Sequence, residues 1–301
     1  MNLDHQHDLL ILGGTVIDGT RAPRRVADVG VRKGRISAIG HLTQHQAVRR
    51  IDATGCIVAP GFIDAHTHDD QALRQRPDMD YKVSQGVTTV ITGNCGVSAA
   101  PLPPRGALPM PLDLIEVPEG QRPARFADYL ATLRAQPAAV NVAALVGHTS
   151  LRACVMSSLD RAATADEITR MQGLLEEALQ AGAIGMSSGT FYPPARQAPM
   201  EELIEVGRPL TTHRALYTTH MRDEGDDIES SLQETFAIGR ALDVPVIISH
   251  HKIRGLHNAG RSRATLPLIR AHMRHQCVGL DCYPYDASST MIHTDEAMLR
   301  G

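Results

Sequence analysis

Residues 60–70 of the chain are PGFIDAHTHDD, an apolar run of strand length that ends in two histidines. The run 62–67 follows a proline and a glycine, as buried strands often do. Side chains two residues apart in an extended segment point the same way, so the imidazoles of His66 and His68 can reach one cation. The stretch therefore predicts a strand with a metal site at its C-terminal end. A pair of solvated loop histidines is the alternative.

Downstream of this stretch, apolar runs of strand length alternate with amphipathic helical segments, which is typical of parallel β/α units. Six further runs occupy residues 88–93, 142–147, 183–188, 215–220, 246–250 and 278–283. Their regular spacing predicts an α/β fold, a (β/α)8-type TIM barrel of which about seven βα units are present.

Two helices between these runs have clear signals. The first is predicted over 164–181, because Thr164 and Glu167 are spaced as a capping box and Gly182 ends the pattern. Its apolar face carries Ile168, Met171, Leu174, Leu175, Ala178 and Leu179. The second is predicted over roughly 227–242. The proline-rich segment 101–123 has no period, so we expect a loop or a lid-like excursion there.

The first sixty residues favour short strands and hairpins instead of helices. Strands are predicted over 8–18, 27–32, 35–40 and 56–60, with a turn at Lys33-Gly34. We therefore expect two domains, the N-terminal part of a small β-sandwich-like domain over 1–60 and the barrel over 61–301. A closed barrel of this kind needs eight strands, and only about one loop follows the seventh. We expect a barrel that is incomplete at its C-terminus: the eighth strand is supplied differently, or the chain is a shortened version of a longer protein.

The bulk composition excludes several classes of function. The net charge of −3 and the scattered arginines give no electrostatic support for a nucleic-acid partner. No run approaches the roughly 18 apolar residues of a membrane-spanning helix, and no signal peptide is visible. Five scattered cysteines, an odd number, do not form the pattern of a disulfide framework. We expect a cytoplasmic protein without a membrane partner, and the sequence leaves the oligomeric state open.

Other predicted strands also finish in residues that bind metals. Cys95 follows the second strand, His220 ends the fifth and His250 ends the sixth, while the seventh finishes in Asp281-Cys282-Tyr283. Because the active sites of such barrels lie at the C-terminal ends of the strands, we expect these side chains to converge. A thiolate with imidazoles suits zinc better than magnesium or calcium, which prefer oxygen ligands.

Six motifs together resemble the amidohydrolase superfamily and, within it, the family of N-acyl-D-amino-acid deacylases (D-aminoacylases). They are PGFIDAHTHDD (60–70), GVTTVITGNCG (86–96), AGAIGMSSGTFYPP (181–194), YTTHMRDEG (217–225), VPVIISHHK (244–252) and LDCYPY (280–285). The motifs span nearly the whole chain. Other branches of the superfamily place a carboxylated lysine after strand four, where this chain has Ser187 and Ser188. Its three lysines, Lys33, Lys82 and Lys252, lie elsewhere.

The resemblance implies roles for individual residues. His66 and His68 match a first metal position, and Cys95, His220 and His250 match a second that holds zinc more tightly, so we expect one tightly bound zinc ion and leave a second open. Lys252, Tyr283 and Ser289 match residues that grip the α-carboxylate or the carbonyl of the substrate, and Tyr192 is a weaker candidate. A surface charge is the alternative for Lys252, and loop packing is the alternative for Tyr192. His148 and His251 are interpreted as structural.

The activity implied is that of a hydrolase acting on linear amide bonds: zinc-dependent cleavage of a small-molecule N-acyl-D-amino acid to a carboxylate and a free D-amino acid. The family's general base, an aspartate of the eighth strand, and a late arginine have no match after Ser289, since Asp295 follows strand seven too soon. The alternatives are a catalytically inactive barrel that binds metal, a fragment unable to fold alone, or another amidohydrolase that acts on cyclic amides. A cyclic-amide hydrolase should have a lysine after strand four, and this chain has none there.

Overall fold

All seven apolar runs predicted as strands form strands in the computed structural model, which describes residues 7–290. They appear as β6 (Phe62–Asp64), β7 (Val87–Thr92), β8 (Asn141–Ala144), β9 (Val146–Gly147), β10 (Gly185–Gly189), β11 (Leu216–His220), β12 (Val246–Ile248) and β13 (Val278–Leu280). One sheet has the order β6-β7-β8 and another the order β13-β12-β11-β10-β9. Neighbouring strands from β9 to β13 run parallel, as do β7 and β8, so the predicted parallel arrangement is confirmed.

The last strand of one sheet, β8, is followed almost directly in the chain by the first strand of the other, β9. The two strands together form one of the predicted apolar runs. Leu145 alone separates them, and its amide donates to the carbonyl of Thr92 at 2.9 Å. The amide of Ile184 donates to the carbonyl of Ala144 at 3.0 Å. The C-terminal ends of parallel strands therefore meet along one edge, where ligands bind in folds of this type.

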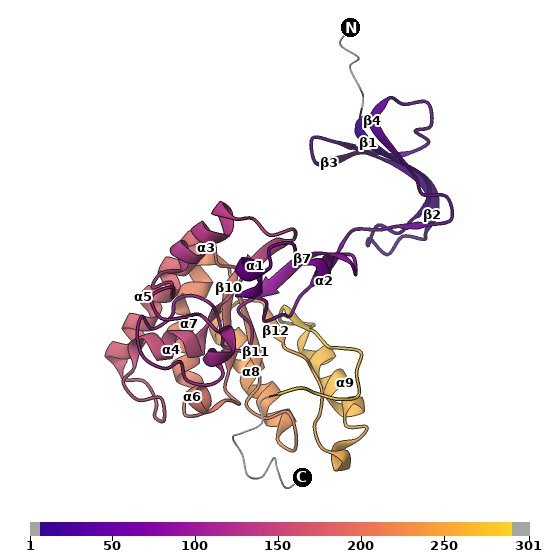
Figure 1. Cartoon of the computed structure of the whole chain (residues 1–301). Helices are drawn as coiled ribbons and strands as arrows, with labels where there is room; N and C mark the ends of the chain where they lie inside the picture. The colour runs from indigo at the N-terminus through magenta and orange to yellow at the C-terminus, as the bar shows by residue number, and fades with distance from the viewer. Residues whose placement is uncertain (1–6, 291–301) are drawn as a thin grey trace. The chain divides into compact units, whose positions relative to one another are not determined.

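Helices pack on the outer side of these strands (Figure 1). They are α1 (Ala72–Gln75), α2 (Asp80–Val83), α3 (Phe126–Ala135), α4 (His148–Val155), α5 (Ala165–Ala181), α6 (Pro193–Arg196), α7 (Met200–His213), α8 (Ile228–Leu242) and α9 (Ser262–His272). The apolar faces of α5 and α7 pack with β9 and β10 in the largest core cluster. Among the described residues, no helix is both long and apolar enough to cross a bilayer.

The two helices predicted with clear signals are confirmed. Thr164 accepts a bond from the amide of Glu167, and the Glu167 carboxylate accepts one from the amide of Thr164, which completes the capping box of α5. Gly182 ends the helix with a φ of 119°, in the left-handed region that favours glycine. Helix α8 spans Ile228–Leu242, one residue shorter at its start than predicted.

The segment 101–123 is irregular, as predicted, but it is not a detached lid. It contains a short 3₁₀ helix over Leu112–Ile115. Leu102, Leu112 and Val117 are buried and belong to the same core cluster as the strands. The apolar side chains of this segment are too irregularly spaced to predict an element, and their burial ties the loop to the barrel.

A separate compact unit ends at Phe62, and the second unit begins at Ile63. The first unit holds β1 (His7–Val16), β2 (Arg25–Arg32), β3 (Arg35–Gly40), β4 (Ala47–Asp52) and β5 (Ile57–Val58), in the order β3-β2-β1-β4 with β5 also on β1. Strand β4 was not predicted. Its sequence AVRRID is largely exposed and lacks an apolar alternation, and its parallel pairing with β1 is a tertiary contact.

Candidate metal centre

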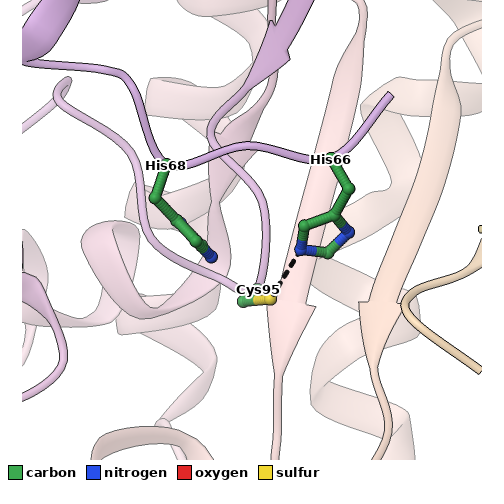
Figure 2. A group of neighbouring side chains, drawn as sticks. All are labelled: His66, His68 and Cys95. Atoms are coloured by element: carbon green, nitrogen blue, oxygen red, sulfur yellow. Dashed lines mark hydrogen bonds between the residues drawn. The ribbon is translucent and has the colours of Figure 1, made fainter. Parts of the chain in front are cut away.

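Five side chains with nitrogen or sulfur donors meet at the C-terminal ends of four strands. His66 and His68 follow β6, Cys95 follows β7, His220 ends β11 and His250 follows β12. They form two groups, His66/His68/Cys95 and Cys95/His220/His250, and within each group the ligand atoms lie within 4.8 Å of one another. Figure 2 shows His66 and His68 extending from one segment toward Cys95, the member that both groups share.

The backbone around Cys95 is shaped to bring its sulfur to this point. Cys95 has a φ of 54°, an uncommon left-handed conformation for a residue with a side chain. It follows Gly93, whose φ is 77° and where a Cβ would lie 2.1 Å from the carbonyl oxygen of Leu145. At Gly189 of β10, a Cβ would lie 2.1 Å from the carbonyl oxygen of Cys95. Only glycine allows both close approaches, so the loop is held against Leu145 and β10.

In each group, a sulfur–nitrogen distance matches that between two ligands of one ion. The sulfur of Cys95 lies 3.2 Å from Nε2 of His66 and 3.4 Å from Nε2 of His250. Tetrahedral zinc, with bonds of about 2.3 Å to sulfur and about 2.0 Å to nitrogen, separates two such ligand atoms by about 3.5 Å. The spacing therefore fits a zinc-type ion.

The protonation of the donors also fits a cation. Burial lowers the pKa of His220 to about 3, so the imidazole is neutral and its lone pair is available. Among residues 7–290, no hydrogen-bond partner lies on the buried Nδ1 of His220. Burial raises the pKa of the Cys95 thiol, so its thiolate form needs a nearby positive charge. A bound metal ion supplies that charge.

A buried carboxylate that the sequence did not single out lies behind the centre. Glu224 is 2% exposed, and its Oε1 lies 2.8 Å from Nδ1 of His250. Its Oε2 lies 2.5 Å from the ammonium of Lys252 and 3.7 Å from Nε2 of His220. Burial opposes ionisation of Glu224, but the contacts with His250, His220 and Lys252 outweigh it and lower its pKa to about 2. Glu224 is therefore an anion that orients one imidazole and fixes one ammonium.

Asp281, directly after β13, was named from the sequence only as a strand-end residue, and its carboxylate contacts the outer nitrogen of the first histidine. Its Oδ2 lies 3.3 Å from Nδ1 of His66, and its Oδ1 accepts a 2.6 Å hydrogen bond from the amide of His250. These contacts leave the Nε2 atoms of His66 and His250 turned toward Cys95. Carboxylates that bond the outer nitrogen of a metal-binding histidine fix its tautomer and orientation.

The residues predicted to contact the substrate lie around the same centre. Lys252, Tyr283, Ser289 and Tyr192 line a cavity of about 410 Å³ together with all five donor residues. The ring of Tyr192 lies 4.8 Å from that of His220, and the ammonium of Lys252 lies 5.8 Å from the ring of Tyr283. Lys252 is not a free surface charge, since it pairs with Glu224. Two further lining residues, Phe191 and Arg254, had not been predicted.

Other residues discussed from the sequence, none of them a predicted site residue, lie outside this arrangement. His148 is fully buried with its Nε2 3.2 Å from Glu202, and His251 contacts Thr265 at 3.1 Å. At the end of β10, where other branches have a lysine, Ser188 bonds the hydroxyls of Tyr217 at 2.6 Å and Thr219 at 2.8 Å. Lys82 pairs with Asp64 at 2.6 Å and Asp69 at 3.0 Å. Asp295 lies outside the described residues.

Comparison with known proteins places this geometry in a family. The chain is 59% identical to a D-aminoacylase of Alcaligenes xylosoxydans xylosoxydans over 98% of its own length and 60% of that protein. A solved D-aminoacylase, described with a binuclear metal centre, superposes with a TM-score of 0.95 at 59% identity, covering 98% of this chain and 62% of that one. The zinc-bound N-acyl-D-glutamate deacylase of Bordetella bronchiseptica, solved with a phosphonate inhibitor, gives a TM-score of 0.88 at 48% identity, covering 93% of this chain and 59% of that one.

The chain thus spans about 60% of the length of the curated D-aminoacylase that it matches. The sequence model of the amidohydrolase family matches residues 49–253, which include all five candidate ligands. The predicted fold of the amidohydrolase kind is confirmed by the superposition on the D-aminoacylase structure. The chain belongs to the amidohydrolase family.

Proposed function

We propose that the chain hydrolyses the amide bond of N-acyl-D-amino acids in a zinc-dependent reaction and releases a carboxylate and a free D-amino acid. The observation that carries the proposal is the convergence of Cys95 with four histidines in the wall of one cavity. The 59% identity to a D-aminoacylase supports the choice of substrate, and the zinc in the N-acyl-D-glutamate deacylase structure supports the choice of metal.

We assign the tighter zinc position to Cys95, His220 and His250, and the group His66, His68 and Cys95 to a second, weaker position. When bound in such a site, zinc polarises a carbonyl oxygen and lowers the pKa of water toward about 7. Cys95 belongs to both groups, so its thiolate would be shared if both positions were filled.

The chain's own residues supply orientation and charge. Glu224 holds His250 by its outer nitrogen and keeps the ammonium of Lys252 in the wall of the cavity. In the proposal, Lys252, Tyr283 and Ser289 bind the α-carboxylate or the carbonyl of the substrate, and the hydroxyl of Tyr192 adds a donor beside His220.

One observation favours a second candidate function, a barrel that binds zinc without hydrolysis. Among the described residues that line the cavity, Glu224 is the one carboxylate. Its two oxygens already contact His250 and Lys252, so it is poorly placed to accept a proton from water. The role of the general base therefore stays unassigned within residues 7–290.

The deciding experiment measures release of free amine from N-acetyl-D-methionine by the purified 301-residue chain loaded with zinc. N-acetyl-L-methionine is the control for stereoselectivity, and the chain with Cys95→Ser is the control for the metal centre. Turnover of the D-enantiomer that requires zinc and Cys95 supports the proposal. A folded, zinc-loaded chain without turnover would support the second candidate instead.

A further inference from the structure

Arg254 is a cation in the cavity wall that pairs with no carboxylate of residues 7–290. Its guanidinium lines both the 410 Å³ cavity and an adjoining groove of about 580 Å³ that includes Leu256 and Tyr285. Within residues 7–290, no carboxylate lies within 4.0 Å of it, and its buried Nε has no hydrogen-bond partner. A buried guanidinium nitrogen without a partner is costly, so a site of this kind favours an anion.

The guanidinium is held one aromatic ring away from the metal centre. The ring of Phe191 stacks on that of His220, with centroids 5.3 Å apart and planes at 21°. The guanidinium carbon of Arg254 lies 4.8 Å from the centroid of Phe191. This contact limits the freedom of the long side chain, so its position relative to His220 is defined.

Lys252 occupies a different place in the same wall. Its ammonium lies 3.0 Å from Nδ1 of His250, the ring nitrogen that faces Glu224, and its charge is opposed by Glu224 at 2.5 Å. The α-carboxylate of an N-acyl-amino acid is joined to the scissile nitrogen through a single carbon. In the proposed function Lys252 binds that α-carboxylate. Arg254, which pairs with no carboxylate among residues 7–290, is left to bind a second anionic group of the substrate.

We propose that Arg254 recognises a second carboxylate of the substrate, separate from the α-carboxylate and distal to the scissile amide. The inference rests on the proposed deacylase function and narrows its substrate class to dicarboxylic N-acyl-D-amino acids. The carboxylate has two chemical sources, an acidic side chain or a dicarboxylic acyl group. A guanidinium binds either one through two parallel charge-assisted hydrogen bonds.

The test compares neutral and dicarboxylic substrates, and its first pair differs by one charge at nearly constant shape. N-acetyl-D-glutamate and N-acetyl-D-glutamine differ in the side chain, and N-succinyl-D-glutamine places the second carboxylate in the acyl group. For the zinc-loaded chain we expect kcat/KM to be at least about tenfold higher for one dicarboxylic compound than for N-acetyl-D-glutamine, as a charged hydrogen bond implies. The dicarboxylic compound with the raised kcat/KM identifies the source of the carboxylate.

Binding provides a readout independent of turnover. Calorimetry with the N-methylphosphonyl derivatives of D-glutamate and D-glutamine, in which a phosphonamidate replaces the amide, should give a matching ratio of Kd values if the side chain is the source. The N-succinyl compound, as a competitor, tests the acyl source in the same way. In Arg254→Gln the ratio should fall to about one, and higher salt should reduce the ratio in the unaltered chain.

Arg208→Gln is the matched control, because Arg208 is an exposed residue of α7 that pairs with Glu205. Arg208→Gln should leave the ratios of kcat/KM and of Kd between the dicarboxylic and neutral compounds unchanged. Thermal denaturation shows whether Arg254→Gln is folded, and Arg254→Lys, which keeps the charge, should retain part of the preference. Turnover of N-acetyl-D-glutamine with no preference for either dicarboxylic compound would overturn this inference alone. Failure to bind or cleave any of the compounds would overturn it together with the proposed function.

Discussion

Glu224 lies with Oε1 2.8 Å from Nδ1 of His250, and the carboxylate is almost completely buried at 2% exposure. The contact fixes which ring nitrogen carries the proton, and it turns Nε2 of His250 toward the sulfur of Cys95, 3.4 Å away. A buried carboxylate without such partners would be strongly destabilising. The position of Glu224 therefore makes sense as the support of a metal ligand and of Lys252.

Replacing Glu224 with glutamine should weaken the metal centre more than the fold. The amide keeps the shape of the side chain but removes the charge that favours the proton on Nδ1 of His250. We expect the affinity for zinc, measured by competition with a chelator, to fall about 10- to 100-fold. Glu229→Gln on the exposed side of α8 is the control and should bind zinc normally, since the Glu229 side chain is 59% exposed. Equal affinities in the two variants would exclude the orienting role.

Cys95→Ser should abolish the tighter zinc position, because both candidate groups contain this thiol. Cobalt substituted for zinc gives an independent signal: a thiolate ligand produces a charge-transfer absorption band that a serine cannot. We expect this band in the unaltered chain and in Cys154→Ser, whose cysteine belongs to neither group. A cobalt band of unchanged intensity in Cys95→Ser would mean that another cysteine is the ligand.

Glu202 should make the stability of the fold sensitive to acid. Burial raises its pKa, but His148, the amide of Ala163 and the guanidinium of Arg152 outweigh this and lower the pKa from 4.5 to about 2. A carboxyl whose pKa is lower in the folded state stabilises the fold above about pH 4.5 and loses that contribution as the pH falls toward 2. The loss is on the order of 3 kcal/mol in the free energy of unfolding.

Urea denaturation at a series of pH values measures this contribution. In Glu202→Gln the slope of the free energy of unfolding against pH should be flatter between pH 5 and 2, and the variant should be about 3 kcal/mol less stable at pH 7 because Arg152 loses its buried partner. Glu205→Gln on the same helix is the control, since Glu205 pairs with Arg208 at the surface. An unchanged slope in Glu202→Gln would show that other carboxyls cause the acid sensitivity.

Much of the fold could be predicted from the sequence, and so could several residues that line the cavity. Both predictions depend on local sequence signals. Buried parallel strands are short continuous apolar runs, and five of these runs are followed by or end in the residues around the centre. The capping box of Thr164 and Glu167 is likewise a local signal. Strand β4 has no such local signal. Its residues are mostly exposed, and the strand is held in place by its long-range pairing with β1.

The roles of Glu224 and Asp281 were not predicted, although both stand inside quoted motifs. In the pair Asp223-Glu224, two adjacent carboxylates have opposite functions. Asp223 accepts bonds from the amides of Gly225 and Asp227 at the start of α8, whereas Glu224 turns inward to His250. Spacing along one chain segment does not distinguish an acid that bonds the turn before a helix from one that supports a metal ligand. The distinction depends on β11, β12 and β13 lying side by side.

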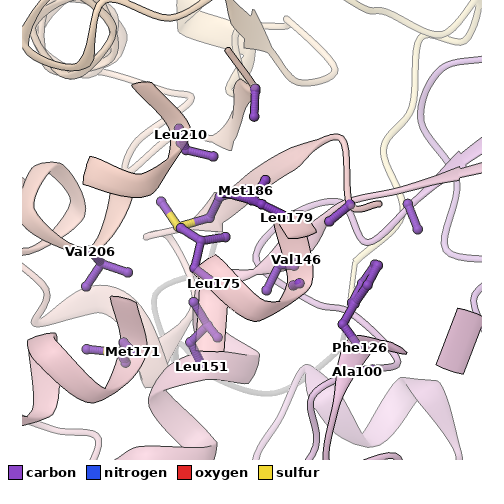
Figure 3. Close-up of a cluster of buried hydrophobic side chains, with 14 of the residues drawn as sticks. Ala100, Phe126, Val146, Leu151, Met171, Leu175, Leu179, Met186, Val206 and Leu210 are labelled. Carbon is purple, nitrogen blue, oxygen red and sulfur yellow. The ribbon is translucent and has the colours of Figure 1, made fainter. Parts of the chain in front are cut away.

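The largest core cluster gives a prediction that is independent of the metal. Leu175 of α5 is fully buried in one core cluster with Met171, Leu179, Met186 and Leu210 (Figure 3). Leu175→Ala removes three carbon atoms and leaves a cavity that close packing prevents from collapsing, so the free energy of unfolding in urea should fall by about 2–5 kcal/mol. Leu266→Ala is the matched control, because Leu266 of α9 is 39% exposed, and its cost should be well below that of Leu175→Ala. A loss of less than about 1 kcal/mol at Leu175 would mean that α5 is not packed against β10 in solution as it is in this structure.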